Sequence, residues 1–168
     1  MARMYPDSYE PGINRGEELI FDRLKNDKDT NDWVVFHSLD IPEHIRQERG
    51  EADFIIIIPH KGILCLEIKG AEKIAVSSSG EWRYYTGNKS YSSIKSPFKQ
   101  ASDNMFSIMN KMTSNIPSSQ KPMFYSGVVF PFTDENTITE TFGFEEWHDF
   151  ELIDANKLNQ GTVRQVFT

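Results

Sequence analysis

Residues 53–69 read Asp-Phe-Ile-Ile-Ile-Ile-Pro-His-Lys-Gly-Ile-Leu-Cys-Leu-Glu-Ile-Lys, a stretch with two apolar runs separated by a short turn sequence. The runs, residues 55–58 and 63–66, are β-branched or aliphatic apart from one cysteine, and residues 59–62 include proline and glycine. This composition predicts a β-hairpin. Because neither run alternates with polar residues, we expect both strands to be buried on both faces.

The hairpin carries an acidic residue at the open end of each strand, Asp53 on the first and Glu67 on the second. If the loop consists of residues 59–61, Ile58 faces Gly62. The same register places Asp53 opposite Glu67, whereas a loop one residue different would put the acids on opposite faces. Directly opposed like charges destabilise a sheet unless they are neutralised. A divalent cation is the simplest neutralising group.

Glu67 and Lys69 are two residues apart, so their side chains project to the same face of the second strand. That face is apolar at Ile63 and Cys65 and becomes ionised at its end. A strand that emerges into solvent with an exposed Glu-x-Lys pair would give the same pattern. The presence of Asp53 on the facing strand favours a functional site instead.

The order of Asp53 and then Glu67-Ile68-Lys69 after an apolar hairpin resembles the D...(D/E)-x-K signature of the PD-(D/E)XK nuclease superfamily. More narrowly, four ordered pieces resemble the nuclease-related domain known as NERD, over roughly residues 15–130. These pieces are residues 16–17, 50–54, 62–70 and 96–100. Ala52 stands where the superfamily has a proline before the first acid. The resemblance implies a restriction-endonuclease-like core.

A helix is expected over residues 15–25, with Asn14 as its cap. Glu17 shares the stripe of Ile20 and Leu24, which is an unusual place for a carboxylate. Acidic residues in a first turn also interact favourably with the helix dipole, which explains Glu17 equally well. The resemblance favours a function, because the family's helix glutamate falls at Glu17.

A second helix is expected over residues 96–112, with Ser96 as cap and Pro97 at its first position. Its apolar stripe, in which the methionines are interpreted as core residues, comprises Phe98, Ala101, Met105, Ile108, Met109 and Met112. Gln100 in the first turn matches a glutamine that the family uses to support its site. From the sequence alone, a surface glutamine is equally compatible.

The remaining segments predict short strands and one polar connection. Strands are expected at residues 32–38, 73–76, 81–85, 89–92 and 122–130, and the connection at residues 39–50. The order of helix, strands, helix and strand predicts an α/β fold whose mixed central β-sheet is flanked by helices. At 168 residues the chain is expected to form one domain, 1–168, with a core at about 15–130 and an acidic, aromatic C-terminal extension at 131–168.

The charge is segregated along the chain, although the net value is -7. Residues 83–121 contain six basic residues and one acid, whereas residues 133–154 contain eight acids and no lysine or arginine. A basic face could therefore meet phosphate, and its candidate nucleic-acid contacts are Arg83, Lys89, Lys95 and Lys99. Ordinary solvated surfaces would explain the same pattern.

Cys65 is the only cysteine, so a disulfide framework and a cysteine-based zinc site are excluded. The four histidines lack ligand spacing and are expected in turns or at the surface; they are His37, His44, His60 and His148. No apolar run approaches the roughly 20 residues that span a bilayer. Residues 1–11 are too polar and acidic for a signal peptide, so we expect a cytoplasmic protein without a membrane partner.

The resemblance implies metal-dependent hydrolysis of phosphodiester bonds, with DNA as the expected substrate. Asp53 and Glu67, with Glu17 directly or through water, would hold one or two Mg²⁺ (or Mn²⁺), which prefer carboxylate and water oxygens. Lys69 would orient the attacking water or stabilise the transition state, and Gln100 would support the site.

Two alternatives remain open. The chain could be a non-catalytic module of the same fold that binds nucleic acid or a protein, for example as the N-terminal part of a larger protein. It could also be a structural adaptor that uses the acidic, aromatic extension at residues 133–168.

Overall fold

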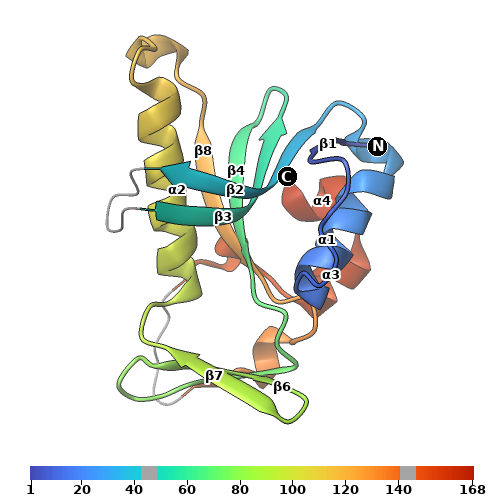
Figure 1. The fold of residues 1–168 in the computed structure, drawn as a ribbon, viewed down its shortest axis with the longest axis vertical. Helices are drawn as coiled ribbons and strands as arrows, with labels where there is room; N and C mark the ends of the chain where they lie inside the picture. The colour runs from blue at the N-terminus through green and yellow to red at the C-terminus, as the bar shows by residue number, and fades with distance from the viewer. Residues whose placement is uncertain (43–48, 141–146) are drawn as a thin grey trace.

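The structure is a computed structural model in which residues 1–42, 49–140 and 147–168 are described. A mixed six-stranded sheet with the order β1-β2-β3-β4-β8-β10 forms its centre (Figure 1). Its strands are β1 (Arg3–Tyr5), β2 (Val34–Pro42), β3 (Arg49–Ile58), β4 (Gly62–Ile68), β8 (Phe124–Val129) and β10 (Leu152–Ile153). The pairs β2·β3 and β3·β4 are antiparallel, and the other three pairs are parallel. The expected α/β fold with a mixed central sheet is confirmed.

The β3–β4 hairpin has the predicted register, because Ile58 pairs with Gly62 and the pairing continues to Phe54 and Leu66. The loop is residues 59–61, and His60 adopts a positive φ of 63° in it. Gly62 is required where β4 begins, since a Cβ there would lie 2.4 Å from the backbone oxygen of Met123. The turn therefore fixes the register on which the facing of the two acids depends.

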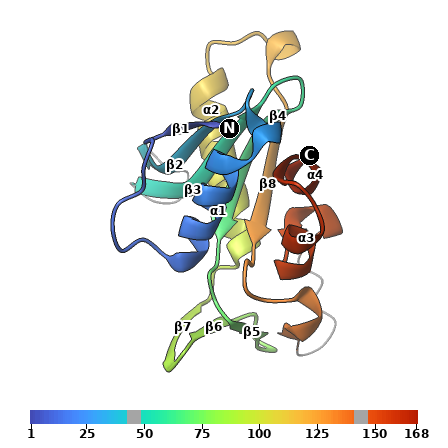
Figure 2. The ribbon, with the colours of Figure 1, turned by 90° about the vertical axis from the view of Figure 1, so that its right-hand side faces the viewer.

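Helices cover both faces of the central sheet (Figures 1 and 2). Helix α1 (Arg15–Asn26) lies on one face together with the short helices α3 (Ala155–Gln160) and α4 (Val163–Phe167), and α2 (Pro97–Thr113) lies on the other. Ile20, Leu24 and Phe167 pack into the larger cluster on the α1 face. Ile108 of α2 packs with Cys65 on the opposite face. Strand β4 is thus buried on both faces, as its unbroken apolar run predicts.

Residues 39–50 are not simply a polar connection, as the sequence had suggested. Strand β2 continues to Pro42 and β3 begins at Arg49, and the two strands stay paired up to Pro42 and Arg49. Backbone hydrogen bonding therefore extends the ladder through polar residues that lack a strand pattern. Residues 43–48, which include His44, lie outside the described residues.

A second sheet of four strands lies at one end of the central sheet (Figure 1). It consists of β5 (Lys73–Val76), β6 (Trp82–Thr86), β7 (Lys89–Ser93) and β9 (Thr139–Glu140), in the order β7-β6-β5-β9. Trp82 and Tyr84 of β6 are buried in a cluster with Phe98 of α2 and Phe130 after β8. The short strands expected at residues 73–76, 81–85 and 89–92 therefore belong to a separate sheet that covers the end of the central one.

The chain after residue 131 contributes to both sheets and to the core. Strand β10 pairs in parallel with β8, and β9 pairs with β5. Leu158, Val163 and Phe167 of the two C-terminal helices are buried in the cluster on the α1 face. Two short helices, α3 and α4, follow each other in this segment.

Helix α2 differs from the predicted apolar stripe on its buried side. Met112 is 44% exposed, so its interpretation as a core residue is wrong. Asp103, Asn104 and Ser107 are buried instead. No helix in the described ranges is long and apolar enough to cross a membrane.

Candidate active site

The open end of the β3–β4 hairpin holds two carboxylates in a poorly solvated environment. Glu67 is only 2% exposed and Asp53 is half-buried. The β3·β4 pairing ends at Phe54 and Leu66, and the next step in the same register sets Asp53 opposite Glu67. Burial, followed by the charge of Glu67, raises the pKa of Asp53 well above its ordinary value. Burial also raises the pKa of Glu67, against the opposing effect of Lys69.

Lys69 lies directly after β4, where its backbone amide donates to the oxygen of Val129 at 3.0 Å. Its Nζ donates to Glu67 Oε1 at 2.7 Å and to Gln100 Oε1 at 3.5 Å. Burial alone would lower the pKa of Lys69, but the charge of Glu67, the hydrogen bond to Glu67 and the charges of Tyr91 and Asp53 together outweigh burial and raise it. Glu67 Oε2 is buried and has no hydrogen-bond partner among the described residues.

The first turn of α1 reaches the same end of β4 through a contact between two glycines. A Cβ on Gly16 would lie 2.9 Å from the Cα of Gly70, and a Cβ on Gly70 would lie 2.3 Å from Oδ1 of Asn14. That Asn14 oxygen accepts the hydrogen bond of the Gly16 amide and caps the helix, as predicted. The contact brings Glu17 close enough to raise the pKa of both Asp53 and Glu67.

His37 of β2 is a polar partner of Glu17. Its Nε2 lies 3.2 Å from Glu17 Oε2, and its ring is 4% exposed between Phe21 and Phe54. The expectation of a turn or surface position is therefore wrong for His37. His60 does lie in the hairpin turn, and His148 precedes a short 3-10 helix at Asp149–Glu151.

Gln100 projects from the first turn of α2, where Ser96 Oγ accepts hydrogen bonds from the amides of Phe98 and Lys99 at 3.2 and 3.4 Å. The predicted cap is confirmed, and it fixes the start of α2 beside Lys69. The structure thus brings together all five sequence-predicted site residues. They come from α1, β3, the end of β4 and α2, and they are Glu17, Asp53, Glu67, Lys69 and Gln100.

Two tyrosines of the small sheet border this cluster and had not been expected there. Lys69 Nζ lies 5.9 Å from the ring centre of Tyr84, and Tyr84 stacks on Tyr91 with centroids 4.7 Å apart. Burial raises the pKa of Tyr91, with Lys69 opposing and Glu67 and Asp53 adding to the effect. The sequence did not predict that Tyr84 and Tyr91 would border the cluster, since their position depends on how the small sheet packs against the rest of the molecule.

The candidate phosphate-binding residues divide into two groups. Lys95 and Lys99 both pair with Asp103, at 3.3 and 2.8 Å, and Lys95 is near enough to Glu67 to lower its pKa. Burial alone would raise the pKa of Asp103, but the hydrogen bonds and the charges of the two lysines together outweigh burial and lower it. Lys95 therefore lies near Glu67, and Lys99 shares its counterion, Asp103.

The other two candidates lie on the small sheet. Lys89 is two residues from Tyr91 on β7, so both side chains project to the same face. Arg83 alternates with the inward-facing Trp82 and Tyr84, is exposed, and donates to Glu81 at 2.9 Å. The structure does not bring Arg83 to the site.

The donor set fits a cation of the magnesium type better than a transition metal. Among the described residues, no group of three or more His, Cys, Asp or Glu side chains is arranged to hold a metal ion. Mg²⁺ is usually bound by one or two carboxylates together with water and phosphate oxygens. Asp53 and Glu67, with the unpartnered Glu67 Oε2, meet that requirement.

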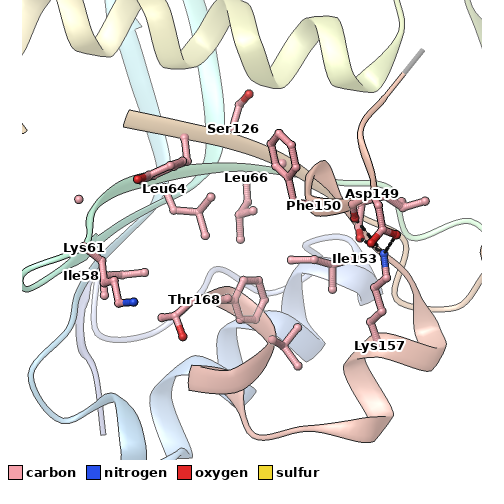
Figure 3. Close-up of a pocket in the computed structure, with 16 residues that line it drawn as sticks. Ile58, Lys61, Leu64, Leu66, Ser126, Asp149, Phe150, Ile153, Lys157 and Thr168 are labelled. Atoms are coloured by element: carbon pink, nitrogen blue, oxygen red, sulfur yellow. Dashed lines mark hydrogen bonds and ion pairs between the residues drawn. The ribbon is translucent and has the colours of Figure 1, made fainter. Parts of the chain in front are cut away.

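A cavity of about 480 Å³ lies on the opposite face of β4 (Figure 3). It is lined by Leu64 and Leu66 together with side chains of the C-terminal segment, including Phe150 and Phe167. None of the five site residues lines it.

A mixed α/β sheet with a carboxylate and lysine cluster at the end of a central hairpin is the arrangement of a nuclease-like core. The chain belongs to the nuclease-related domain family, NERD, whose model matches residues 14–131, more than half of the sequence. No curated protein and no solved structure matches the chain.

Proposed function

We propose that this chain is a metal-dependent nuclease that hydrolyses phosphodiester bonds, with DNA as its substrate. The observation that carries the proposal is the cluster of Asp53, Glu67 and Lys69 at the end of a buried hairpin. Burying facing carboxylates is costly, and such an arrangement is typical of functional sites. Membership of the nuclease-related family supports the same conclusion.

Asp53 and Glu67 would hold one or two Mg²⁺, or Mn²⁺, between the strands. A bound divalent cation supplies a water of lowered pKa and offsets charge on the scissile phosphate. Lys69 would orient the attacking water or neutralise charge that develops on the phosphate. Its Nζ is held between Glu67 and Gln100, so the position of the ammonium group is set before substrate arrives. Such preorganisation reduces the cost of orientation during the reaction.

Glu17 and His37 would complete the site from the α1 face. The 3.2 Å contact with the buried His37 holds the Glu17 carboxylate near the two facing acids. In that position Glu17 would accept hydrogen bonds from water at the cation. Lys95, Lys99 and Lys89 would contact the phosphates of the strand on either side of the cleaved bond.

A cleavage assay on linear, circular and single-stranded DNA in Mg²⁺ tests this proposal. Wild type should cleave, Glu67→Ala should not, and Lys69→Ala should be slower by on the order of 10² to 10³. Lys61→Ala is the matched control, because Lys61 is an exposed lysine at the turn of the same hairpin. Cleavage by Lys69→Ala at the wild-type rate would refute the assignment, and cleavage of circular DNA would establish an internal cut.

A second function is favoured by one specific observation. The ion pair between Lys69 and Glu67 already neutralises the buried carboxylate, which suits a binding module of the same fold that does not turn over. Calorimetric titration with Mn²⁺ separates the two functions. A nuclease should bind Mn²⁺ and lose that binding in Asp53→Ala, whereas a non-catalytic module should bind no Mn²⁺ in either form.

A further inference from the structure

Tyr91 presents an aromatic ring to solvent and stacks on a second, buried tyrosine, Tyr84. It is 53% exposed on the edge strand β7, and Tyr84 of β6 is its direct partner in the ladder. The two rings stack with centroids 4.7 Å apart and planes at 20°. Tyr84 is only 1% exposed and packs in the cluster of Trp82 and Phe98, so the support is fixed by the core.

The stacked pair borders the proposed reaction centre. Lys69 Nζ is 5.9 Å from the Tyr84 ring centre, on the ring that Tyr91 covers. The charges of Lys69, Glu67 and Asp53 all act on the Tyr91 hydroxyl. The contact of Lys69 with Tyr84 and the stack of Tyr84 on Tyr91 together connect Lys69 to Tyr91. Because one strand of DNA rises about 3.4 Å per nucleotide, the distance from Lys69 to Tyr91 corresponds to a few nucleotides.

A single exposed tyrosine is ordinary on a protein surface, but the surroundings of Tyr91 are not those of an apolar contact patch. Its neighbours on β7 are Ser90 and Ser92, which are exposed, and Lys89 shares its face of the strand. An open aromatic ring beside a lysine matches what unpaired nucleotides need, since bases stack on aromatic rings while a cation contacts the backbone.

We propose that Tyr91, backed by Tyr84, stacks on an unpaired base of the substrate, so that the site selects single-stranded DNA or strands with unpaired nucleotides beside the cleaved bond. This inference rests on the proposed function. In a blunt duplex the bases are stacked on each other and are not available to Tyr91. Stacking is tolerant of sequence, because every base has a π face.

Fluorescence anisotropy in EDTA tests the inference without cleavage, with a labelled short single-stranded DNA and its blunt duplex as probes. Tyr91→Leu should weaken single-strand binding by about 5- to 150-fold, the range for loss of one base–aromatic stack. Tyr91→Phe should bind like wild type, because it keeps the ring, and duplex binding should be unchanged in both. A single strand that lacks the bases should bind weakly to wild type and Tyr91→Leu alike.

The matched control is Tyr125→Leu, which removes a tyrosine of similar exposure, 46%, from the cavity on the opposite face. It should leave both affinities unchanged. Wild-type affinity in Tyr91→Leu would overturn the inference. So would an equal loss in Tyr91→Phe and Tyr91→Leu, because the hydroxyl rather than the ring would then be the contact.

Cleavage of the same probes in Mg²⁺ separates this inference from the proposed function. If wild type cleaves neither probe but single-strand binding still depends on the Tyr91 ring, hydrolysis is refuted and stacking stands. If wild type cleaves both probes equally and Tyr91→Leu slows neither, hydrolysis stands and stacking is refuted.

Discussion

The carboxylate of Asp53 accepts a hydrogen bond from the backbone amide of Ile68 at 2.7 Å, at the point where the β3·β4 ladder stops. A side chain thus satisfies an amide that a continued ladder would have paired with backbone. The same carboxylate faces Glu67, so one residue both marks the end of the β3·β4 ladder and contributes to the proposed metal site.

Asp53→Asn and Asp53→Ala should therefore differ in stability while sharing a loss of cleavage. Asparagine keeps an oxygen for the Ile68 amide and removes a buried charge, so its free energy of unfolding should equal or exceed that of wild type. Alanine leaves the amide unpaired, which costs about 1–3 kcal/mol. Urea unfolding of both variants in EDTA measures the difference. Equal stability of the two would show that the hydrogen bond is not important.

In the metal-free protein, the free energy of unfolding should depend on pH through the raised pKa values of Asp53 and Glu67. Burial first, and then neighbouring charge, raises the pKa of Asp53 well above 3.8, and burial raises that of Glu67 above 4.5. The folded state therefore binds more protons, so their contribution to stability is full below about pH 4 and is lost as the pH rises through the folded values. In urea unfolding, the advantage of Asp53→Asn over wild type should grow from about pH 4 to pH 7. A constant difference would contradict the raised pKa.

Replacing Lys69 should destabilise the fold, because the buried Glu67 then lacks the ammonium group that pairs with it. Glu67 is 2% exposed and Lys69 17%, so Lys69→Met is expected to lower the free energy of unfolding by about 3 kcal/mol. Adding Glu67→Gln removes the stranded charge and should restore most of that loss. The control is Arg83→Met, because Arg83 and its partner Glu81 are 55% and 30% exposed and the loss of that surface pair should cost less than about 1 kcal/mol. No loss in Lys69→Met would contradict a buried pair.

Releasing Lys95 and Lys99 from Asp103 should strengthen the salt dependence of nucleic-acid binding. In Asp103→Asn the two lysines lose their shared counterion and become available to phosphates. The slope of log affinity against log salt for single-stranded DNA should then steepen by about 0.7 to 1.4. Glu81→Gln frees Arg83 on the outward face of the small sheet and should leave the slope unchanged. Equal slopes in Asp103→Asn and wild type would contradict the assignment of both lysines to the nucleic-acid-binding surface.

The parts of the site that follow from local rules could be predicted from the sequence. The hairpin register depends on the turn around His60 and Gly62, and the helix caps depend on Asn14 and Ser96. Each is decided within a few residues of chain. The position of Asp53 opposite Glu67 could therefore be predicted from this one sequence, without homologues.

What could not be predicted depends on how separate elements dock. His37 carries no sequence signal of its burial, because Phe21, Phe54 and Glu17 reach it from α1 and β3. Tyr91 likewise gains its place from the docking of the small sheet, in which Trp82 packs against Phe98 of α2 and Phe130 after β8. Such contacts are set by packing between elements far apart in the chain.

The meeting of Gly16 and Gly70 determines how rigid the site can be. A helix and a strand usually contact each other through side chains, which can change rotamer when one element shifts. Here two backbones touch directly, with the Cα of Gly70 2.9 Å from the point where a Gly16 Cβ would lie. A displacement of α1 is therefore expected to move the end of β4 with it. The end of β4 that carries the proposed site is thus held by the large core behind α1, and a surface substitution that loosens this helix is expected to displace Lys69 without contacting it.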